Sequence, residues 1–502
     1  MTSVVLHAAT AANVRDAASQ QAQLEALIAQ FAGGQVALKY YSAANALLDT
    51  CTHAAWTINT ATTPRQAEVG ALVSESGRVA GPTAASYVIA AVPGGADILR
   101  ADVSLAANVG TATGRVNLAP QTGGAGLVVT ADAGLPAVPT PTWLSAIAVG
   151  EWGVVTSTSL SASGVGWSGT SPGGSGGFAD VISAWGGAVI NTQGFYSGST
   201  WIDGPALVLW GGGHSNYAGN EVYCLSLNTN TPTWYRPRDP TITAPENVAE
   251  DGSGNPVSRH TYDSIVYVGD GTRNWLLTIG GLFYYSTAGS TDYLHTFDFD
   301  VASPNSNTPW SKQTAASPGP GLYTALDATA GRVWYAPYAV NKVAYYDIAT
   351  DTHAEASFKS PNFGTRGASD LDTSRGLWFI NTNLGLMGYR TNNGTANDYY
   401  TVSTTGTGPA TADGFLYDPD ADAFIGWAGG KTIYTLTPPG TNPYAGGNSW
   451  TWSSSTPSGG ATPTAVGAQG TYGRFARVVI GAAKGYIAIN AADESVYFYR
   501  TA

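Results

Sequence analysis

A unit of short strands recurs between about residue 142 and the end of the chain, and such repetition restricts the fold more than any other feature of the sequence. Each copy opens with a hairpin, in which an apolar strand and an aromatic strand flank a tight turn of Asp or Gly. A strand with a Val-Tyr-like centre follows, and a strand that carries Trp closes several copies. Six hairpins are present, with second strands at residues 206–210, 275–281, 333–336, 377–380, 424–427 and 486–489.

Four strands in a unit of about 45–70 residues are the arithmetic of propeller blades. A single blade exposes two apolar faces, and a ring of blades covers them all. The last copy ends at Ala502 after its third strand, whereas Thr142–Ser145 resembles the missing Trp-bearing fourth strand. We therefore expect a mainly β fold with a six-bladed propeller over residues 142–502, closed by a strand at 142–145. A solenoid, the alternative architecture, does not need such closure.

The first 34 residues are expected to form an N-terminal helix. Residues 11–32 contain no Gly or Pro and place apolar side chains on one face, and Gly33 with Gly34 ends the pattern. A single amphipathic helix must dock on its own chain, on a copy of itself or on a partner.

A small β-sandwich-like domain is expected over residues 35–131, followed by a linker. Its strands are predicted at residues 36–41, 85–92 and 97–103, with Gly-rich turns between them. Residues 132–141 contain three prolines, which favour an extended, semi-rigid chain and indicate a domain boundary.

Charge and cysteine content exclude several classes of function. The net charge is −12 with 22 Lys and Arg residues spread thinly, so we expect no nucleic-acid partner. No run of 18 apolar residues exists, so no membrane span is expected. Cys51 and Cys224 are interpreted as two buried thiols. This cysteine usage fits a reducing site of synthesis. No signal peptide is expected, because the first seven residues lack its basic and apolar parts.

Residues 210–223, which read Trp-Gly-Gly-Gly-His-Ser-Asn-Tyr-Ala-Gly-Asn-Glu-Val-Tyr, resemble a kelch-type repeat. Residues 259–262 together with Gly280 and Gly281 resemble the next copy. The resemblance implies a propeller like the central domain of galactose oxidase. That fold also carries copper oxidases with a Tyr-linked Cys, but Cys224 lies in the middle of a strand, so we expect no copper and no other cofactor.

A second resemblance, carried by residues 40–50 and 92–100, is to small N-terminal domains of tailed-bacteriophage virion proteins. It implies that the helix and the small domain bind other virion proteins. The propeller would then be displayed on a particle assembled in the host cytoplasm, and a homo-oligomer is compatible with this arrangement.

Candidate ligand-binding residues lie in the two best repeats. They are His214, Asn216, Tyr217, Arg259, His260, Tyr284 and Tyr285. The alternative for His214 and His260 is that each shapes its own loop by hydrogen bonding, and aromatic rings are also consumed by propeller cores. Replacing Tyr217 and Tyr285 by Ala is expected to weaken attachment to host cells without affecting folding.

Metal and catalytic sites are not predicted. The six histidines show no metal-ligand spacing, and Asp418, Asp420 and Asp422 are interpreted as turn caps rather than a calcium loop. The Gly-x-Ser-x-Gly match at residues 173–177 lacks the strand–turn–helix context of a nucleophile elbow. Clustered arginines suggest a sialidase, but the Asp-box repeat of that family is absent.

Together these observations predict a non-enzymatic virion protein that recognises a host-surface glycan. The alternatives are a passive capsid or tail decoration protein without a ligand, and a glycan-cleaving hydrolase.

Overall fold

The computed structural model divides the chain into two compact units, Met1–Pro139 and Thr140–Ala502. The division falls within the proline-containing residues 132–141. The structure describes residues 3–7, 36–41, 47–53, 56–59, 66–69, 73–74, 87–91, 97–102, 115–118, 140–169, 176–213, 216–241, 249–270, 273–280, 282–283, 293–316, 321–337, 343–356, 367–391, 399–410, 414–440, 443, 449–467 and 469–502.

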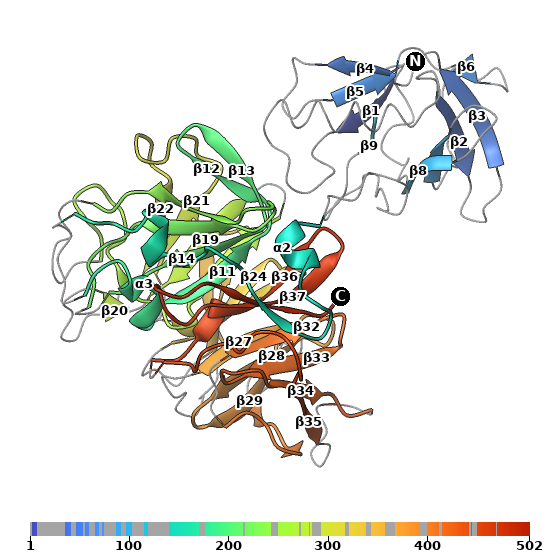
Figure 1. The fold of residues 1–502 in the computed structure, drawn as a ribbon. Helices are drawn as coiled ribbons and strands as arrows, with labels where there is room; N and C mark the ends of the chain where they lie inside the picture. The colour runs from blue at the N-terminus through green and yellow to red at the C-terminus, as the bar shows by residue number, and fades with distance from the viewer. Residues whose placement is uncertain are drawn as a thin grey trace. The chain divides into compact units, whose positions relative to one another are not determined.

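The first unit contains two sheets (Figure 1). One has the order β4-β5-β1-β9, from Trp56–Asn59, Gln66–Val69, Ser3–His7 and Arg115–Leu118. The other has the order β6-β3-β2-β7-β8, from Val73–Ser74, Leu47–His53, Val36–Tyr41, Tyr87–Ala91 and Asp97–Asp102. Strands β2, β7 and β8 coincide with the predicted ones. The predicted helix at 11–32 lies outside the described residues, and the anchoring role of this unit stays a prediction.

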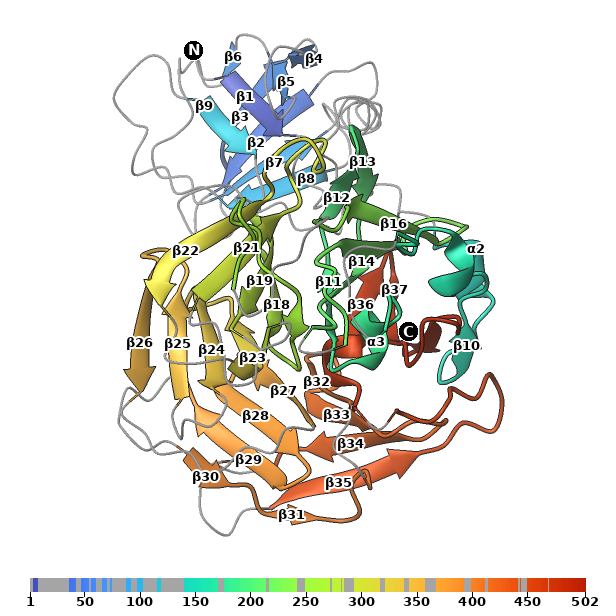
Figure 2. The ribbon, with the colours of Figure 1, turned by 90° about the vertical axis from the view of Figure 1, so that its left-hand side faces the viewer.

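The second unit is a six-bladed β-propeller. Figure 2 shows the propeller viewed down the axis of the ring. The innermost strands β11, β18, β23, β27, β32 and β36 surround this axis. Blades 1 to 3 are β11 (Gly187–Asn191), β14 (Ala206–Trp210), β15 (Val222–Ser226) and β16 (Thr233–Arg238); β18 (Ile265–Gly269), β19 (Asn274–Ile279), β21 (Tyr293–Asp298) and β22 (Trp310–Ala316); and β23 (Gly321–Asp327), β24 (Arg332–Pro337), β25 (Val343–Asp347) and β26 (Thr352–Ala356).

The other three blades follow the same up-and-down order of strands. Blades 4 to 6 are β27 (Gly367–Asp372), β28 (Leu377–Thr382), β29 (Gly385–Arg390) and β30 (Tyr399–Thr401); β32 (Gly414–Asp418), β33 (Ala423–Trp427), β34 (Ile433–Thr437) and β35 (Trp450–Ser455), with β31 (Thr404–Thr405) added at the edge; and β36 (Phe475–Ile480), β37 (Ala483–Ala488), β38 (Tyr497–Arg500) and β10 (Trp152–Val154).

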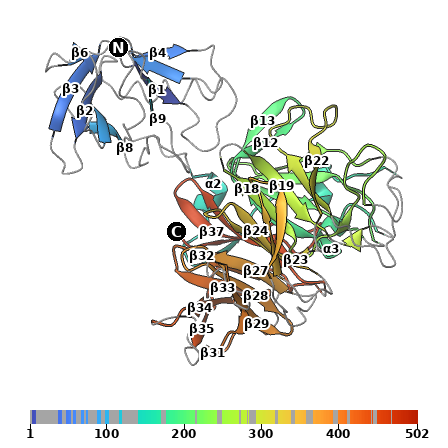
Figure 3. The same ribbon diagram turned by 180° about the vertical axis from the view of Figure 1, so that it is seen from behind.

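Short elements decorate the blades. They are the hairpin β12 (Gly194–Ser197) and β13 (Thr200–Asp203), which projects from blade 1 (Figures 1 and 3), the pair β17 (Arg259–His260) and β20 (Leu282–Phe283), the helices α2 (Thr142–Ser145) and α3 (Asp180–Ser183), and the 3-10 turns η4 (Ser161–Ser163) and η5 (Tyr472–Arg474). No helix of the described residues is long and apolar enough to cross a membrane.

The ring is closed by a strand from the start of the propeller, as predicted, but the strand is not the predicted one. Strand β10 pairs antiparallel with β38, and Trp152 lies opposite Tyr499. Thr142–Ser145 instead forms α2, in which the carbonyl of the N-cap residue Pro141 accepts the amides of Leu144 and Ser145. The closing strand does carry a Trp, as expected, but this residue is Trp152 and not Trp143.

Six apolar clusters hold the ring together, one between each pair of neighbouring blades. Strand alternation explains this: in β14, Leu207 and Leu209 pack toward blade 6, whereas Val208 and Trp210 pack toward blade 2. The thiol of Cys224 is free and fully buried in the cluster between blades 1 and 2, as predicted.

Of the three aspartates interpreted as turn caps, Asp418 caps its turn, whereas Asp420 and Asp422 pair with basic side chains of neighbouring blades. Asp418 accepts the amide of Asp420 at 2.9 Å and the hydroxyl of Tyr486 at 2.6 Å. Asp422 is paired with Arg375 of blade 4 at 2.5 Å. Among the described residues, no group of three or more His, Cys, Asp or Glu side chains could hold a metal ion. These aspartates therefore stabilise turns and blade contacts.

If β10 closes the ring, Trp152→Ala should destabilise the propeller by about 3–5 kcal/mol, because it empties a buried site. The Trp152 ring is 1% exposed, packs 5.5 Å from Trp427 of blade 5 and donates to the Lys431 carbonyl at 3.1 Å. Chemical unfolding followed by circular dichroism measures the change. Val154→Ala on the same strand is the control, since Val154 is 41% exposed and its loss should cost less than about 1 kcal/mol. Equal effects of the two substitutions would contradict closure by β10.

Candidate functional site

The longer described connections of the propeller lie mainly at one end of the ring. Because the strands of each blade run up and down, connections from second to third strands and from one blade to the next emerge on the same side. We call this side the loop face. Its described residues include 155–169, 176–186, 211–213, 216–221, 239–241, 249–264, 456–467 and 469–474, which contain every candidate residue that the structure describes.

The three glycines that follow β14, Gly211–Gly213, pack closely against the segment that leads into blade 2. Gly212 has a φ of 96°, in the left-handed region that favours glycine. A Cβ on Gly213 would lie 2.2 Å from the Ser258 carbonyl oxygen. Glycine is therefore required for the close approach of these two backbones.

Aromatic side chains gather around the axis on this face, and we call Trp185, His260, Tyr262 and Tyr472 the axial cluster. The rings of Trp185 and His260 have centroids 4.5 Å apart, and Tyr262 packs edge-on against Tyr472 at 5.7 Å. Trp185, Tyr262 and Tyr472 precede the inner strands of blades 1, 2 and 6. Three blades thus contribute equivalent rings to one place.

The backbone of the axial cluster is strained. Trp185, Tyr262 and Tyr472 have φ values of 49°, 50° and 50°, a left-handed conformation that bulky residues rarely adopt. Each such residue costs on the order of 1–3 kcal/mol, and such strain concentrates at functional sites. The Tyr262 amide donates to the Trp185 carbonyl at 2.8 Å, which links two of these residues.

Asp263 anchors the axial cluster beneath the surface. Its Oδ2 accepts the amide and the hydroxyl of Ser369 in blade 4 at 2.8 and 2.9 Å, and its carbonyl accepts the Thr324 hydroxyl of blade 3 at 2.7 Å. Burial, with a smaller contribution from Asp370, raises the pKa of Asp263 well above its ordinary value. The segment that carries Tyr262 is therefore fastened to two further blades.

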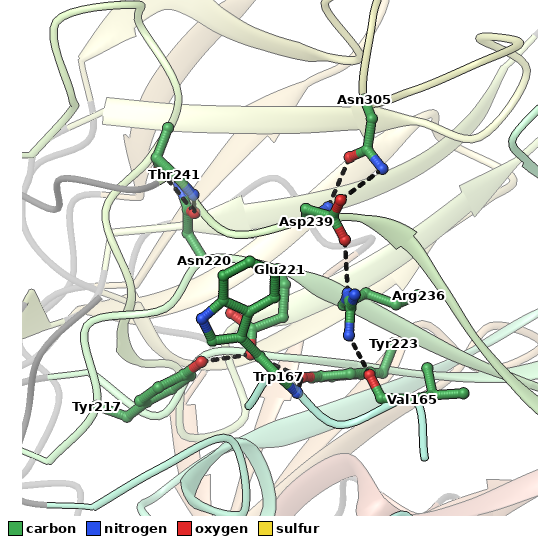
Figure 4. A network of polar contacts seen from close by, with 10 residues as sticks. All are labelled: Val165, Trp167, Tyr217, Asn220, Glu221, Tyr223, Arg236, Asp239, Thr241 and Asn305. Atoms are coloured by element: carbon green, nitrogen blue, oxygen red, sulfur yellow. Dashed lines mark hydrogen bonds and ion pairs between the residues drawn. The ribbon is translucent and has the colours of Figure 1, made fainter. Parts of the chain in front are cut away.

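A buried carboxyl lies in the same face of blade 1 (Figure 4). Glu221 Oε1 accepts the hydroxyls of Tyr217 and Tyr223 at 2.7 and 2.8 Å, and the Tyr223 hydroxyl accepts the amide of Trp167 at 3.0 Å. Glu221 Oε2 is buried and has no hydrogen-bond partner in the described part of the chain. Burial raises the pKa of Glu221, although the two tyrosine hydroxyls oppose that shift.

Arg236 lies near this carboxyl group and joins the connection that holds Val165 and Trp167 to the one that begins at Asp239. Its guanidinium lies 5.1 Å from the Trp167 ring centroid, donates to the Val165 carbonyl and pairs with Asp239 at 2.6 Å. Asp239 in turn exchanges two hydrogen bonds with Asn305, at 2.7 and 2.9 Å. The network holds Trp167, which is partly exposed, in a fixed place on the loop face.

The structure brings two of the predicted ligand-binding residues together: His260 Nε2 lies 3.0 Å from Oδ1 of Asn216. His214, Tyr284 and Tyr285 lie outside the described residues.

The other two predicted residues lie in the interior, and our expectation for them is corrected. Tyr217 is 2% exposed and bound to Glu221, so its ring offers no face to a sugar and its loss would disturb folding. Arg259 is fully buried, lies 5.5 Å from the Trp210 ring centroid and donates to the Gly280 carbonyl at 2.8 Å. Burial lowers its pKa to about 9. The guanidinium of Arg259 therefore donates to backbone carbonyls in the interior and does not reach a ligand at the surface.

Sequence reasoning missed Trp185, Tyr472, Trp167 and Glu221. Two of them share a signal, since Trp185 and Tyr472 are aromatic residues followed at once by glycine shortly before an inner strand. Glu221 and Tyr223 are two residues apart at the start of β15, where alternation places both side chains on one face.

Comparisons with known proteins show no matching family model and no matching curated protein. Similar solved structures include the major allergen Mala s 1 of Malassezia sympodialis, with 12% identity over 64% of this chain and 95% of that chain and a TM-score of 0.38. An auxiliary nutrient binding protein from Bacteroides ovatus has 9% identity over 92% of this chain and 90% of that chain, with a TM-score of 0.37. Similarities at this level carry no argument about the function of this chain.

Replacing Glu221 with Gln should remove a pH dependence of stability. Because its folded pKa is raised, the folded state holds a proton that the unfolded state loses above a pKa of about 4.3. Stability of the wild type therefore falls as pH rises from about 4 toward the folded pKa, and Glu221→Gln should flatten this fall. Unfolding midpoints between pH 4 and 8 measure the difference, with exposed Glu355→Gln as the control. Equal pH profiles for wild type and Glu221→Gln would contradict a neutral buried carboxyl.

Proposed function

We propose that this chain is a bacteriophage virion protein whose propeller recognises a host-surface glycan through the loop face, without chemical turnover. The observation that carries the proposal is the axial cluster, in which the partly exposed Trp185 joins the buried Tyr262 and Tyr472, and the backbone of all three residues is strained. Strain of this kind persists only where surrounding structure imposes it, and it is typical of binding sites.

The chemistry of the loop face favours recognition. Aromatic rings bury large apolar area with little loss of side-chain entropy, and binding sites combine them with a few polar groups that fix orientation. Trp185 and Trp167 are both partly exposed, and the amide of Asn216 lies beside the first through its bond to His260. Sugar rings offer apolar C–H faces and hydroxyl groups, which match this combination.

The virion assignment and the kelch type of the repeats belong to the same proposal. The supporting residues are 40–50 and 92–100 for the virion assignment and 210–223 for the kelch repeat. The unit Met1–Pro139 would bind other virion proteins and leave the propeller displayed.

One observation favours a second candidate, a glycan-cleaving hydrolase. Glu221 has a raised pKa and two tyrosine partners, and a raised carboxyl pKa is typical of a general acid. However, Glu221 is fully buried, so a substrate could not reach it without rearrangement of the surrounding structure. We therefore place glycan binding first.

The proposal is tested by measuring binding of the purified full chain to cells of the bacterial host in which the virions assemble. We expect saturable binding that periodate treatment of the cells abolishes, because periodate cleaves sugar diols, and that protease treatment leaves unchanged. The chain should also copurify with virions on a density gradient.

Two results would contradict this function. Copurification without any cell binding would indicate a passive decoration protein. Release of new reducing ends from a host polysaccharide by the wild type, but not by Glu221→Gln, would indicate the hydrolase.

A further inference from the structure

Two hydrogen-bond donors at the axial cluster have no acceptor in the described part of the protein. Trp185 is partly exposed, and its indole N–H makes no hydrogen bond there. Asn216 is also partly exposed; its Oδ1 lies 3.0 Å from His260 Nε2, and its Nδ2 makes no hydrogen bond with any residue that the structure describes. With His260 Nε2 protonated, the ring donates to Oδ1 and leaves both amide hydrogens of Asn216 available.

The positions of both side chains are fixed before any ligand arrives. The Trp185 ring packs 4.5 Å from the His260 ring, and its carbonyl accepts the Tyr262 amide. The Asn216 carbonyl accepts the Gly176 amide at 2.9 Å, and the amide of the next residue, Tyr217, donates to Gly212 at 2.9 Å. A ligand that binds here would therefore order few side chains, which reduces the entropic cost of binding.

The charge around these donors favours an uncharged ligand. The Asp180 carboxyl group lies close by, because a Cβ on Gly176 would collide with Asp180 Oδ2, and the Gly176 amide donates to the Asn216 carbonyl. The nearby arginines, Arg259 and Arg474, are buried and donate to backbone carbonyls. An anionic sugar would gain no exposed cation from these residues and would meet the Asp180 carboxyl group.

We propose that Trp185 and Asn216 form the contact site for an uncharged sugar ring, which stacks on the indole and accepts hydrogen bonds from the indole N–H and the Asn216 amide. This inference rests on the proposed glycan-binding function and gives it a place and a ligand class. His260 is a positioning residue that holds Asn216 and supports the indole.

The test measures binding of the full chain to immobilised polysaccharides, with uncharged glucan, mannan and galactan compared with acidic alginate and polysialic acid. Trp185→Ala should weaken binding about tenfold or more. Trp185→Phe, which keeps a ring but loses the N–H, should weaken it about three- to tenfold. Asn216→Asp keeps the acceptor for His260 but loses both donors, so it should have a similar effect.

Trp275→Ala is the matched control, because Trp275 is a partly exposed Trp at the other end of the ring, 5.4 Å from Arg273, and its loss should leave binding unchanged. Circular dichroism confirms that each variant is folded.

The outcomes separate the two proposals. If the wild type binds no polysaccharide and no cells, the proposed function fails. If the wild type binds, and Trp185→Ala and Asn216→Asp bind as tightly as the wild type, the proposed site is wrong while the proposed function stands. Preference for the acidic polysaccharides would overturn the assignment of an uncharged ligand.

Discussion

Packing between neighbouring blades is the interaction on which the rest of this propeller depends. Each four-stranded sheet is apolar on both faces, and each of the six clusters is shared by two blades. No blade can bury its faces alone, so the ring must close. Closure by β10 makes the first strand of the ring in sequence the last strand of blade 6, and it couples residues near 152 to those near 499.

A closed ring also explains how the strained residues on the loop face are maintained. The segments that enter blades 1, 2 and 6 converge at the axis, where Trp185, Tyr262 and Tyr472 adopt left-handed backbone conformations. Asp263 joins this region to blades 3 and 4 through Thr324 and Ser369. The energy of the six interfaces thus supports a small cluster whose local geometry is unfavourable.

Much of the fold could be predicted, because strand alternation and turn chemistry are local properties of the chain. The hairpins were found from Asp and Gly turns between aromatic strands, and every one of them is present. The closing strand was predicted at Trp143 and not at Trp152, because both residues are Trp in a short segment before the first blade. Only the pairing of β10 with β38 shows that Trp152 belongs to the closing strand. The site was predicted less well, since left-handed Trp185 and the burial of Tyr217 and Arg259 depend on contacts between distant segments.

A disulfide across the closing strand tests ring closure most directly. Val154 lies opposite Tyr497 in the ladder between β10 and β38, and opposed residues have Cα atoms about 4.5–5.5 Å apart, within disulfide range. Val154→Cys with Tyr497→Cys should form a bond under mild oxidation, detected by mass spectrometry, and should raise the melting temperature. Val154→Cys with Tyr499→Cys, two residues out of register, should cross-link poorly. Failure of the first pair, or equal cross-linking of both, would contradict closure by β10.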